Sequence, residues 1–450
     1  MAGSAWRFVL AGVVAVSAPA HADQPASSVV IEGVAVFEPE TGKMLDGRTI
    51  VVHGERIVAV TSASEKLELP PDATRIDGRG RFALPGLIDA HVHLVHVLDL
   101  AGVSGEEVLP LYLAAGVTSV RSAGDEIFAA TRVARFAAAN PETSPRVFTC
   151  SPLLDADPPI HRGAGRAVTD AAQVPAVLDE VQARGATTVK IYAGTGRPVG
   201  RAIIDEAHRR GMFVTAHLGA YAAQDAVVDG IDGLEHIWSV FNYVIPPEVS
   251  AQIGHRGRLD LSNPLCESLI ANLAKRKTFV DPTLAVFRNM ILLPDVPAVR
   301  DHLDIAHVPQ RLRDFWPVYL RQSGCPQGGP LEDRQREFAK YQELTGKLYA
   351  AGVPLLVGTD SPEPQVTPGF SLHQELEMLV EAGLTPAAAL QAATLNNALA
   401  LRQQDFLGSI TAGKFADLVL LSDNPLDDIR NTRTIESSSA AGGSVNRRTS

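Results

Sequence analysis

The alternation of eight short apolar runs with alanine-rich helical stretches limits the fold of this chain more than any other feature. Each run has the length of a buried strand. In order, the runs read "LPGLIDAHVHL", "GVTSVRSAG", "RVFTCSPLL", "TTVKIYAG", "FVTAHLG", "GLEHIW", "TFVDPTL" and "PLLVGTDSP". Strands that alternate with helices form parallel sheets, and eight such units are typical of a closed barrel. The sequence therefore predicts an α/β fold in which residues 83–403 form a (β/α)8 TIM barrel.

The stretches between these runs carry helix start and stop signals. Residues 171–185 and 200–211 each end at a glycine with basic residues just before it, and residues 371–383 also end at a glycine. Residues 385–401 begin at a threonine followed by proline, which is typical of a helix start. The sequence predicts helices in these four places.

One connection is longer than a barrel needs. Between His236 and Asp360 the chain has roughly 60 residues more than two strand–helix units of about 31 residues each. The surplus lies between Phe241 and Tyr349, in a proline-rich stretch that includes the aromatic residues Phe315, Trp316 and Tyr319. Long connections at the strand ends of such barrels set specificity, so we expect a substrate lid here.

Segments with the sequence pattern of short β-strands flank the predicted barrel on both sides. Valine- and isoleucine-rich segments broken by glycine and aspartate occupy residues 23–82, and the same pattern returns in residues 404–435. We expect these two parts to form one small composite β-sandwich domain, with the barrel inserted between them. The last stretch, residues 436–450, reads "ESSSAAGGSVNRRTS" and has few apolar side chains that could be buried. We expect it to be a disordered tail, which would leave the domain without an edge strand.

Residues 1–22 have the pattern of a secretory signal peptide. One cation, Arg7, precedes an apolar run of about eleven residues and the small-residue site Ala20-His21-Ala22. A run of that length is too short for a membrane anchor, which needs about twenty residues. We expect cleavage after Ala22 and a periplasmic or secreted protein.

Composition limits which classes of binding partner are expected. The formal net charge of −11 and the pI near 5.6 argue against nucleic acid or an anionic membrane as the main partner. A small-molecule substrate is expected, and homo-oligomerisation is left open. Three cysteines do not make a disulfide scaffold, and a Cys266–Cys325 bond is also left open.

Chemically capable side chains recur where the predicted strands end, the edge at which such barrels place their active sites. These residues are His91, His93, Lys190, His217, His236 and Asp360. His91 and His93 are two apart, so on a strand they share a face. Each residue alone has an ordinary interpretation, such as a core histidine, an ion-paired lysine or a helix cap. Together, imidazoles and a carboxylate at one edge indicate a site for zinc or a similar divalent ion.

The motifs "LPGLIDAHVHL", "VKIY", "TAHLG", "LEHIW" and "VGTDSP", with the C-terminal "GLTPAAALQAATLNNALALRQQDFLGSITAGKFADLVLLSDNPL", resemble those of the amidohydrolase superfamily. The resemblance is to the imidazolonepropionase-like and Xaa-Pro or Xaa-Arg dipeptidase-like branch of these metal-dependent hydrolases. It runs from about Val30 to Ile435, nearly the whole mature chain.

The resemblance implies two divalent ions, with zinc the first expectation. His91 and His93 would bind one ion, His217 and His236 the second, and a carboxylated Lys190 would bridge them. Asp360 would bind the first ion and act as the catalytic proton shuttle. The physical chemistry agrees, because burial among cations lowers the pKa of a lysine amine, and the neutral amine can take up carbon dioxide.

The expected activity is hydrolysis of an amide-type C–N bond by a metal-bridging hydroxide. The substrate would be a dipeptide that ends in proline or a basic residue, or a cyclic amide. His161 and Tyr192, which follow the third and fourth strands, are expected to bind substrate. An ester, lactone or phosphotriester hydrolase with the same site is the alternative. A catalytically silent binding protein ranks lowest, because all six expected metal-binding residues are present.

Overall fold

The computed structural model describes residues 28–62, 65, 71–246, 256–292, 303–322 and 329–439. The predicted signal peptide and Cys325 lie outside these ranges. Cys150 and Cys266 are buried free cysteines. None of the helices in the described ranges has both the length and the apolar character needed to cross a membrane.

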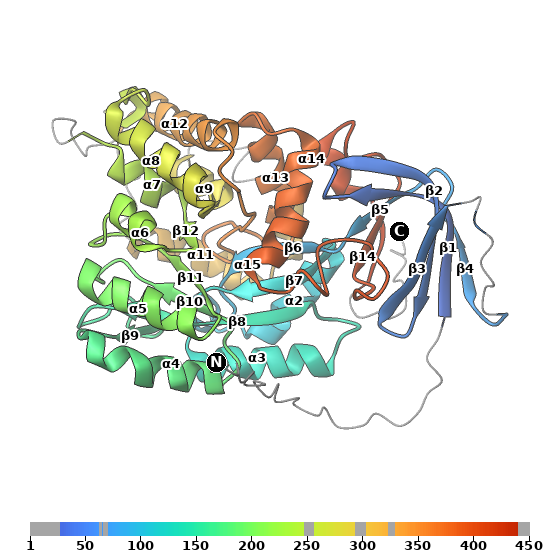
Figure 1. Ribbon diagram of the computed structural model, residues 1–450, viewed down its shortest axis with the longest axis horizontal. Helices are drawn as coiled ribbons and strands as arrows, with labels where there is room; N and C mark the ends of the chain where they lie inside the picture. The colour runs from blue at the N-terminus through green and yellow to red at the C-terminus, as the bar shows by residue number, and fades with distance from the viewer. Residues whose placement is uncertain are drawn as a thin grey trace, which may run out of the picture.

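The body of the protein is a parallel barrel surrounded by helices (Figure 1). Seven of its strands pair in the order β6-β7-β8-β10-β11-β12-β13, each parallel to its neighbour. Their bounds are β6 (Leu87–Val92), β7 (Val117–Ser122), β8 (Arg146–Asp155), β10 (Thr188–Ile191), β11 (Phe213–Ala216), β12 (Gly233–Glu235) and β13 (Phe279–Asp281). A short strand, β9 (Gly165–Ala167), adds to β8.

The eighth predicted run closes the barrel. Leu355 pairs in parallel with Val280 of β13, and Ser361 pairs in parallel with Val92 of β6. The backbone also bonds on both sides, from Leu356 N to the Val280 carbonyl and from Asp360 N to the His91 carbonyl. The predicted (β/α)8 barrel is therefore confirmed.

The strands lack polar–apolar alternation because both of their faces are covered. Every residue of β6 and of β7 is buried, as expected for parallel strands that carry side chains into the barrel and helices on the outside. The covering helices that precede β13 are α1 (His96–Leu100), α2 (Gly105–Ala114), α3 (Ile127–Ala139), α4 (Val174–Ala183), α5 (Arg197–Arg209), α6 (Ala223–Asp229), α7 (Ile237–Tyr243) and α8 (Pro264–Arg276).

The four predicted helices are present. Two of them are α4 and α5, and a third is α13 (Ser371–Glu381). In the fourth place the Thr385 hydroxyl accepts a hydrogen bond from Ala388 N and caps α14 (Pro386–Gln391), which continues into α15 (Asn397–Ala400) through one π-helical turn.

After β13 the long connection forms further helices. They are α9 (Leu284–Leu292), α11 (Gln310–Gln322) and α12 (Leu331–Ala350). The indole Nε1 of buried Trp316 in α11 donates to the Pro362 carbonyl at 2.8 Å, just past the eighth strand. Glu375 of α13 accepts hydrogen bonds from Leu284 N and Ala285 N, and so caps the start of α9. Two helices of the connection are thus fixed to the end of the barrel.

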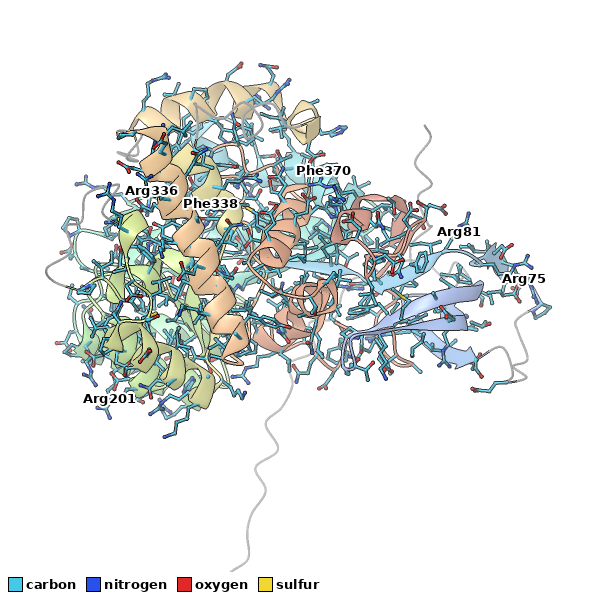
Figure 2. All side chains as sticks on the ribbon, turned by 90° about the horizontal axis from the view of Figure 1, so that it is seen from above. Arg75, Arg81, Arg201, Arg336, Phe338 and Phe370 are labelled. Atoms are coloured by element: carbon cyan, nitrogen blue, oxygen red, sulfur yellow. The ribbon has the colours of Figure 1, made fainter. Side chains whose placement is uncertain are left out.

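The two ends of the chain form one small β domain, as predicted. Its sheet has the order β15-β14-β5-β1-β2-β3, with β4 paired to β1. The bounds are β1 (Ser28–Glu38), β2 (Lys43–His53), β3 (Arg56–Ser62), β4 (Thr74–Asp77), β5 (Phe82–Pro85), β14 (Leu418–Leu421) and β15 (Ile435–Ser439). Arg56 of β3 pairs with Phe415, just before β14, so the sheet rolls over its own apolar core. In Figure 2 this domain, marked by Arg75 and Arg81, extends away from the barrel helices that carry Arg201 and Arg336.

The predicted disordered tail begins too early. Residues 436–439 belong to β15, which pairs with β14, and Glu436 forms an ion pair with Arg81 at 2.6 Å. Alternate residues of β15 are buried, beginning with Ile435. Backbone pairing stabilises this edge strand although three of its five residues are serines, which is why composition alone gave the wrong result. Residues 440–450 lie outside the described residues.

Candidate metal centre

One cavity of about 200 Å³ lies at the carboxyl ends of the barrel strands. All of the predicted ligand residues line it: His91, His93, Lys190, His217, His236 and Asp360. They come from five different strands or the residues directly after them. The structure thus brings together residues that are up to 269 positions apart in the sequence, from His91 to Asp360.

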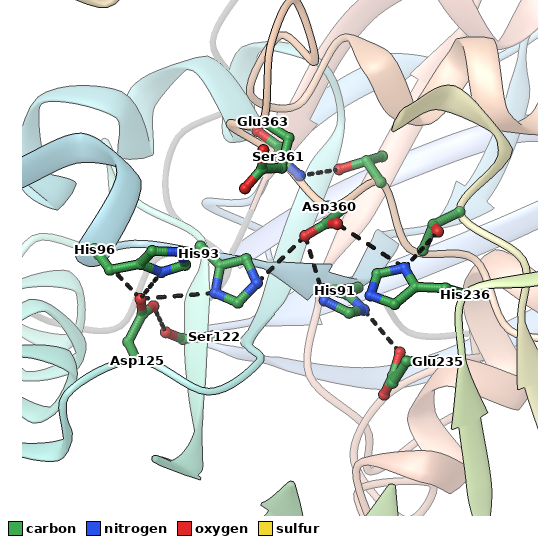
Figure 3. Close-up of polar contacts among 12 residues, drawn as sticks. His91, His93, His96, Ser122, Asp125, Glu235, His236, Asp360, Ser361 and Glu363 are labelled. Carbon is green, nitrogen blue, oxygen red and sulfur yellow. Dashed lines mark hydrogen bonds and ion pairs between the residues drawn. The ribbon is translucent and has the colours of Figure 1, made fainter. Parts of the chain in front are cut away.

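Asp360 lies at the centre of the histidines (Figure 3). Its Oδ1 is 3.4 Å from Nε2 of His91 and 3.3 Å from Nε2 of His93. Its Oδ2 is 3.9 Å from Nδ1 of His236, whose ring centroid lies 4.6 Å from that of His217. Ligand atoms of His91, His236 and Asp360 lie close enough together to hold one metal ion.

Strained backbone places two of these side chains. His236 has φ of 67° and Asp360 has φ of 62°, a left-handed conformation that non-glycine residues seldom adopt. At His236 the turn breaks the alternation of the strand, so that Glu235 and His236, although adjacent, both face the barrel interior. Such strain is concentrated at functional sites, where the surrounding packing holds it.

The second nitrogen of His91 is held by a buried carboxylate. His91 Nδ1 lies 2.7 Å from Oε2 of Glu235. The other oxygen of Glu235 accepts hydrogen bonds from the Arg121 guanidinium and from the Thr215 hydroxyl. Arg121 also donates from Nε to the Ala90 carbonyl at 2.5 Å. This network leaves His91 Nε2 buried without a hydrogen-bond partner among the described residues.

A second carboxylate lies behind His93. Asp125 Oδ1 is 3.7 Å from His93 Nδ1 and 3.2 Å from His96 Nδ1. Asp125 also accepts from the Ser122 hydroxyl and from the backbone NH groups of Leu94 and His96. With so many donors already bound, Asp125 orients the two imidazoles rather than offering a free ligand atom.

Lys190 is the least satisfied side chain of the cavity. It is 1 % exposed, and its Nζ has no hydrogen-bond partner within the described ranges. Burial lowers its pKa; Glu235 opposes this shift and Arg121 adds to it. Burial, with Lys190 second, also lowers the pKa of His217 to about 3, and it lowers that of His91 to about 4. A lowered pKa favours the neutral imidazoles of His217 and His91 and the uncharged amine of Lys190, which are the forms that bind a metal ion. His93 differs, because Asp125 and Asp360 overcome the effect of its burial and raise its pKa to about 10.

Both predicted substrate residues also line the cavity. His161 and Tyr192 have ring centroids 5.3 Å apart, and Tyr192 is 4.9 Å from the ring of His217. Burial, followed by His96 and His93, lowers the pKa of His161 to about 4. The imidazole is therefore neutral at pH 7 and can either donate or accept a hydrogen bond.

Several residues of the site were not predicted. In the barrel interior these are Arg121, Asp125 and Glu235; at the cavity wall they are Val286, Phe287, Met290 and Glu363, together with Tyr319 as a lining residue. Charged residues inside strongly apolar strands, as in "SVRS" and "GLEH", are a signal that could have found Arg121 and Glu235, because a buried charge needs a partner. For Glu363 and Met290 the sequence gives no comparable signal.

Comparisons with known proteins agree with this architecture. Imidazolonepropionase from Anaeromyxobacter sp. (strain K) is 25% identical over 443 residues, which cover 88% of this chain and 90% of the relative. The crystal structure of a prolidase complexed with N-methylphosphonate-L-proline has a TM-score of 0.68 and 24% identity, over 94% of this chain and 100% of that one. Bottromycin amidohydrolase has a TM-score of 0.71 and 24% identity, over 92% of this chain and 86% of that one. The two structures show the same fold.

The family assignment rests on a longer match. The sequence pattern of the amidohydrolase family covers residues 82–440, which include the whole barrel, β14 and β15. Hydrolase activity on amide bonds, and metal dependence in general, are characteristic of this family. The chain is a hydrolase that belongs to the amidohydrolase family.

Proposed function

We propose that this protein is a binuclear metal-dependent hydrolase of amide-type C–N bonds in dipeptides or cyclic amides. The observation that carries the proposal is the convergence of four imidazoles, Asp360 and the unpartnered amine of Lys190 on one cavity. Relatives named imidazolonepropionase and prolidase support the choice of these two substrate classes.

In this proposal the ligand nitrogens of His91 and His236 are selected by the hydrogen bond at the other nitrogen of each ring. Glu235 occupies Nδ1 of His91, and the Thr283 hydroxyl lies 2.8 Å from Nδ1 of His236, so that Nε2 of each ring is left for a metal ion. His91 and His93 would hold one ion, with Asp360, and His217 and His236 the other. Lys190, as a carbamate, would bind both and convert an uncharged amine into an anionic ligand.

Divalent ions in this position, zinc being the first expectation, would polarise the scissile carbonyl and lower the pKa of a bound water. Residues of the protein would provide proton transfer and substrate binding. Asp360 would accept the proton of the attacking water on a carboxylate oxygen and pass it to the leaving nitrogen. Tyr192 and His161, at the cavity wall, would hold the substrate by hydrogen bonds, and the barrel mouth would exclude bulk water.

The test combines metal content with turnover. Protein purified without chelators should contain two divalent ions per chain by elemental analysis. It should hydrolyse at least one member of a panel of dipeptides and cyclic amides. A chelator should remove the activity, and zinc should restore it. Turnover of esters or phosphotriesters alone by metal-replete protein would refute the amidase proposal, and no turnover of any kind would favour a binding protein.

A further inference from the structure

A second cavity, of about 500 Å³, lies at the end of the barrel opposite the metal centre. Phe213 and Phe279, which line it, are the first residues of β11 and β13, whereas the metal centre lies at the carboxyl ends of the strands. In the described part of the chain the two cavities share no lining residue. The volume is within the range of roughly 300–1,000 Å³ that is typical of small-molecule sites.

Three basic side chains line this cavity. Arg276 and Lys277 come from the end of α8, and Arg402 follows α15. Within the described ranges Arg276 and Lys277 form no ion pair, and Lys277 Nζ donates to the Gly352 carbonyl at a long 3.5 Å. Arg402 Nη2 is 3.9 Å from Oδ1 of Asp232. On a chain with a net charge of −11, a group of cations with so few carboxylates is an exception.

The carboxylate of Asp232, which also lines the cavity, has other partners. Its Oδ2 accepts a hydrogen bond from Val214 N at 2.8 Å and lies 3.0 Å from Nε2 of His208. The hydrogen bond with Asp232 raises the pKa of His208, although partial burial opposes this shift. The imidazolium form is therefore favoured and offsets the carboxylate, so the cavity keeps an excess of positive charge.

Two of the basic residues have a backbone conformation that favours glycine. Lys277 ends α8 and Arg402 follows α15, and each has φ of 57°. Gly230, which ends α6 and lines the same cavity, has φ of 99° and is the usual residue type for such a position. A cation near a helix end is stabilised by the helix dipole, but it does not remove the cost of the left-handed backbone. Two long basic side chains at such positions, both on one cavity, indicate a role for the side chains.

Apolar surface lies beside these cations. Phe279 is half-buried, and Leu399 is 39% exposed. The ring of Phe213 lies 6.0 Å from that of Phe279, and the Arg402 guanidinium is 6.0 Å from the Phe213 ring centroid. A ligand with a ring next to a negative group could therefore contact both kinds of surface. Guanidinium groups bind phosphate oxygens in pairs, and an ammonium group binds phosphate as a point charge.

We propose that this cavity binds an aromatic phosphate monoester. Arg276, Lys277 and Arg402 would hold the phosphate, because three cations match a doubly charged group better than a single carboxylate. Phe279 and Leu399 would contact the ring. The proposal does not rest on the proposed function, since the cavity is separate from the metal centre.

A binding experiment uses phenyl phosphate as the probe. Metal-replete protein is titrated in a calorimeter with phenyl phosphate and with benzyl alcohol, which has the same ring and no charge. Wild type should bind phenyl phosphate at least tenfold more tightly. Arg402→Gln and Lys277→Gln should each weaken this binding at least fivefold. The matched controls are Arg201→Gln and Lys275→Gln, which change exposed residues that do not line the cavity and should keep the wild-type affinity.

Stability separates a ligand site from a role in ending helices. In Lys277→Gly and Arg402→Gly the loss of left-handed strain offsets the greater freedom of glycine in the unfolded chain. Their melting temperatures should therefore be unchanged or higher, while phenyl phosphate binds more weakly. Lower melting temperatures with unchanged binding would assign both cations to the helix ends and overturn the site.

Phosphate bound at the metal ions would give a different result. Such binding would survive both glutamine substitutions, and that outcome overturns the proposed site. Binding of phenyl phosphate no tighter than that of benzyl alcohol overturns it as well. Amide hydrolysis by Arg402→Gln should equal that of wild type, because the cavity lies at the other end of the barrel. Loss of phenyl phosphate binding in this variant supports the site even if no amide is hydrolysed, so the two proposals fail separately.

Discussion

His91 Nδ1 lies 2.7 Å from Oε2 of Glu235, and this contact leaves the other ring nitrogen, Nε2, to point at Asp360. The carboxylate is held from behind by Arg121, so the imidazole is the end of a buried chain of charge-assisted hydrogen bonds. Carboxylates that orient a ligand imidazole contribute about 10- to 100-fold to metal affinity.

Glu235→Gln should therefore weaken metal binding by about that factor. It also leaves the Arg121 charge unpaired, so the melting temperature should fall. Competition with a chromogenic chelator measures the affinity. Glu180→Gln, which removes a half-exposed partner of Arg166, is the control and should change neither quantity. Unchanged metal affinity in folded Glu235→Gln would remove the orienting role of this carboxylate.

Lys190→Ala should cost at least one of the two ions and lower activity by orders of magnitude, since it deletes the proposed shared ligand. Acetate or propionate should restore part of the turnover by occupying the vacated space. Reconstitution of wild-type apoprotein should be faster with bicarbonate, because the carbamate has to form before it can bind. One ion per chain and no bicarbonate effect would contradict the binuclear centre.

Trp316→Ala should raise KM by about tenfold, roughly 1.4 kcal/mol, and leave metal content unchanged. The substitution deletes the hydrogen bond to the Pro362 carbonyl and the buried contact that holds α11 against the cavity. Steady-state kinetics and elemental analysis provide the two readouts. Val318→Ala, on the exposed side of the same helix, is the control. Loss of metal in Trp316→Ala would mean that α11 belongs to the barrel core and is not a lid.

The contribution of Glu375 to stability should decrease with rising pH. Burial raises its pKa from 4.5 to about 8, although two backbone hydrogen bonds oppose the shift. Between these values Glu375 is more protonated in the folded protein than in the unfolded chain, so its contribution is fully present below about pH 4.5 and is lost as the pH rises to about 8.

Urea denaturation from pH 5 to 9 checks this dependence. Glu375→Gln cannot ionise, so its stability relative to wild type should increase with pH, by an amount on the order of a few kcal/mol. Glu381→Gln, exposed on the same helix α13, should show no such trend. If the difference in stability between Glu375→Gln and wild type were constant from pH 5 to 9, Glu375 would be ionised throughout that range.

We propose export on the basis of residues 1–22, and the mature N-terminus tests it. Protein recovered from a native host should begin near Asp23 in N-terminal sequencing. Cytoplasmic protein that retains Ala2 would contradict a cleaved signal peptide.

The barrel and its ligand positions were predictable because their signals are local. A buried strand is a short apolar run, and each of His217, His236 and Asp360 directly follows such a run or lies at its end. The orienting carboxylate Glu235 was missed because strict alternation places neighbours on opposite faces, and the left-handed turn at His236 reverses that rule. Nothing in the composition of the long connection indicates that Tyr319 meets Glu363, since that contact depends on how α11 packs.

The rolled sheet of the small domain can be completed only after the C-terminal part of the chain has been synthesised. β5 enters the barrel directly, and its open side is covered by β14, which is made more than 330 residues later. A ribosome-bound chain that ends before Leu418 therefore presents the edges of β5 and β3 to other proteins, and such edges invite aggregation. Completion of synthesis covers both edges, because β14 then pairs with β5 and Phe415 with Arg56.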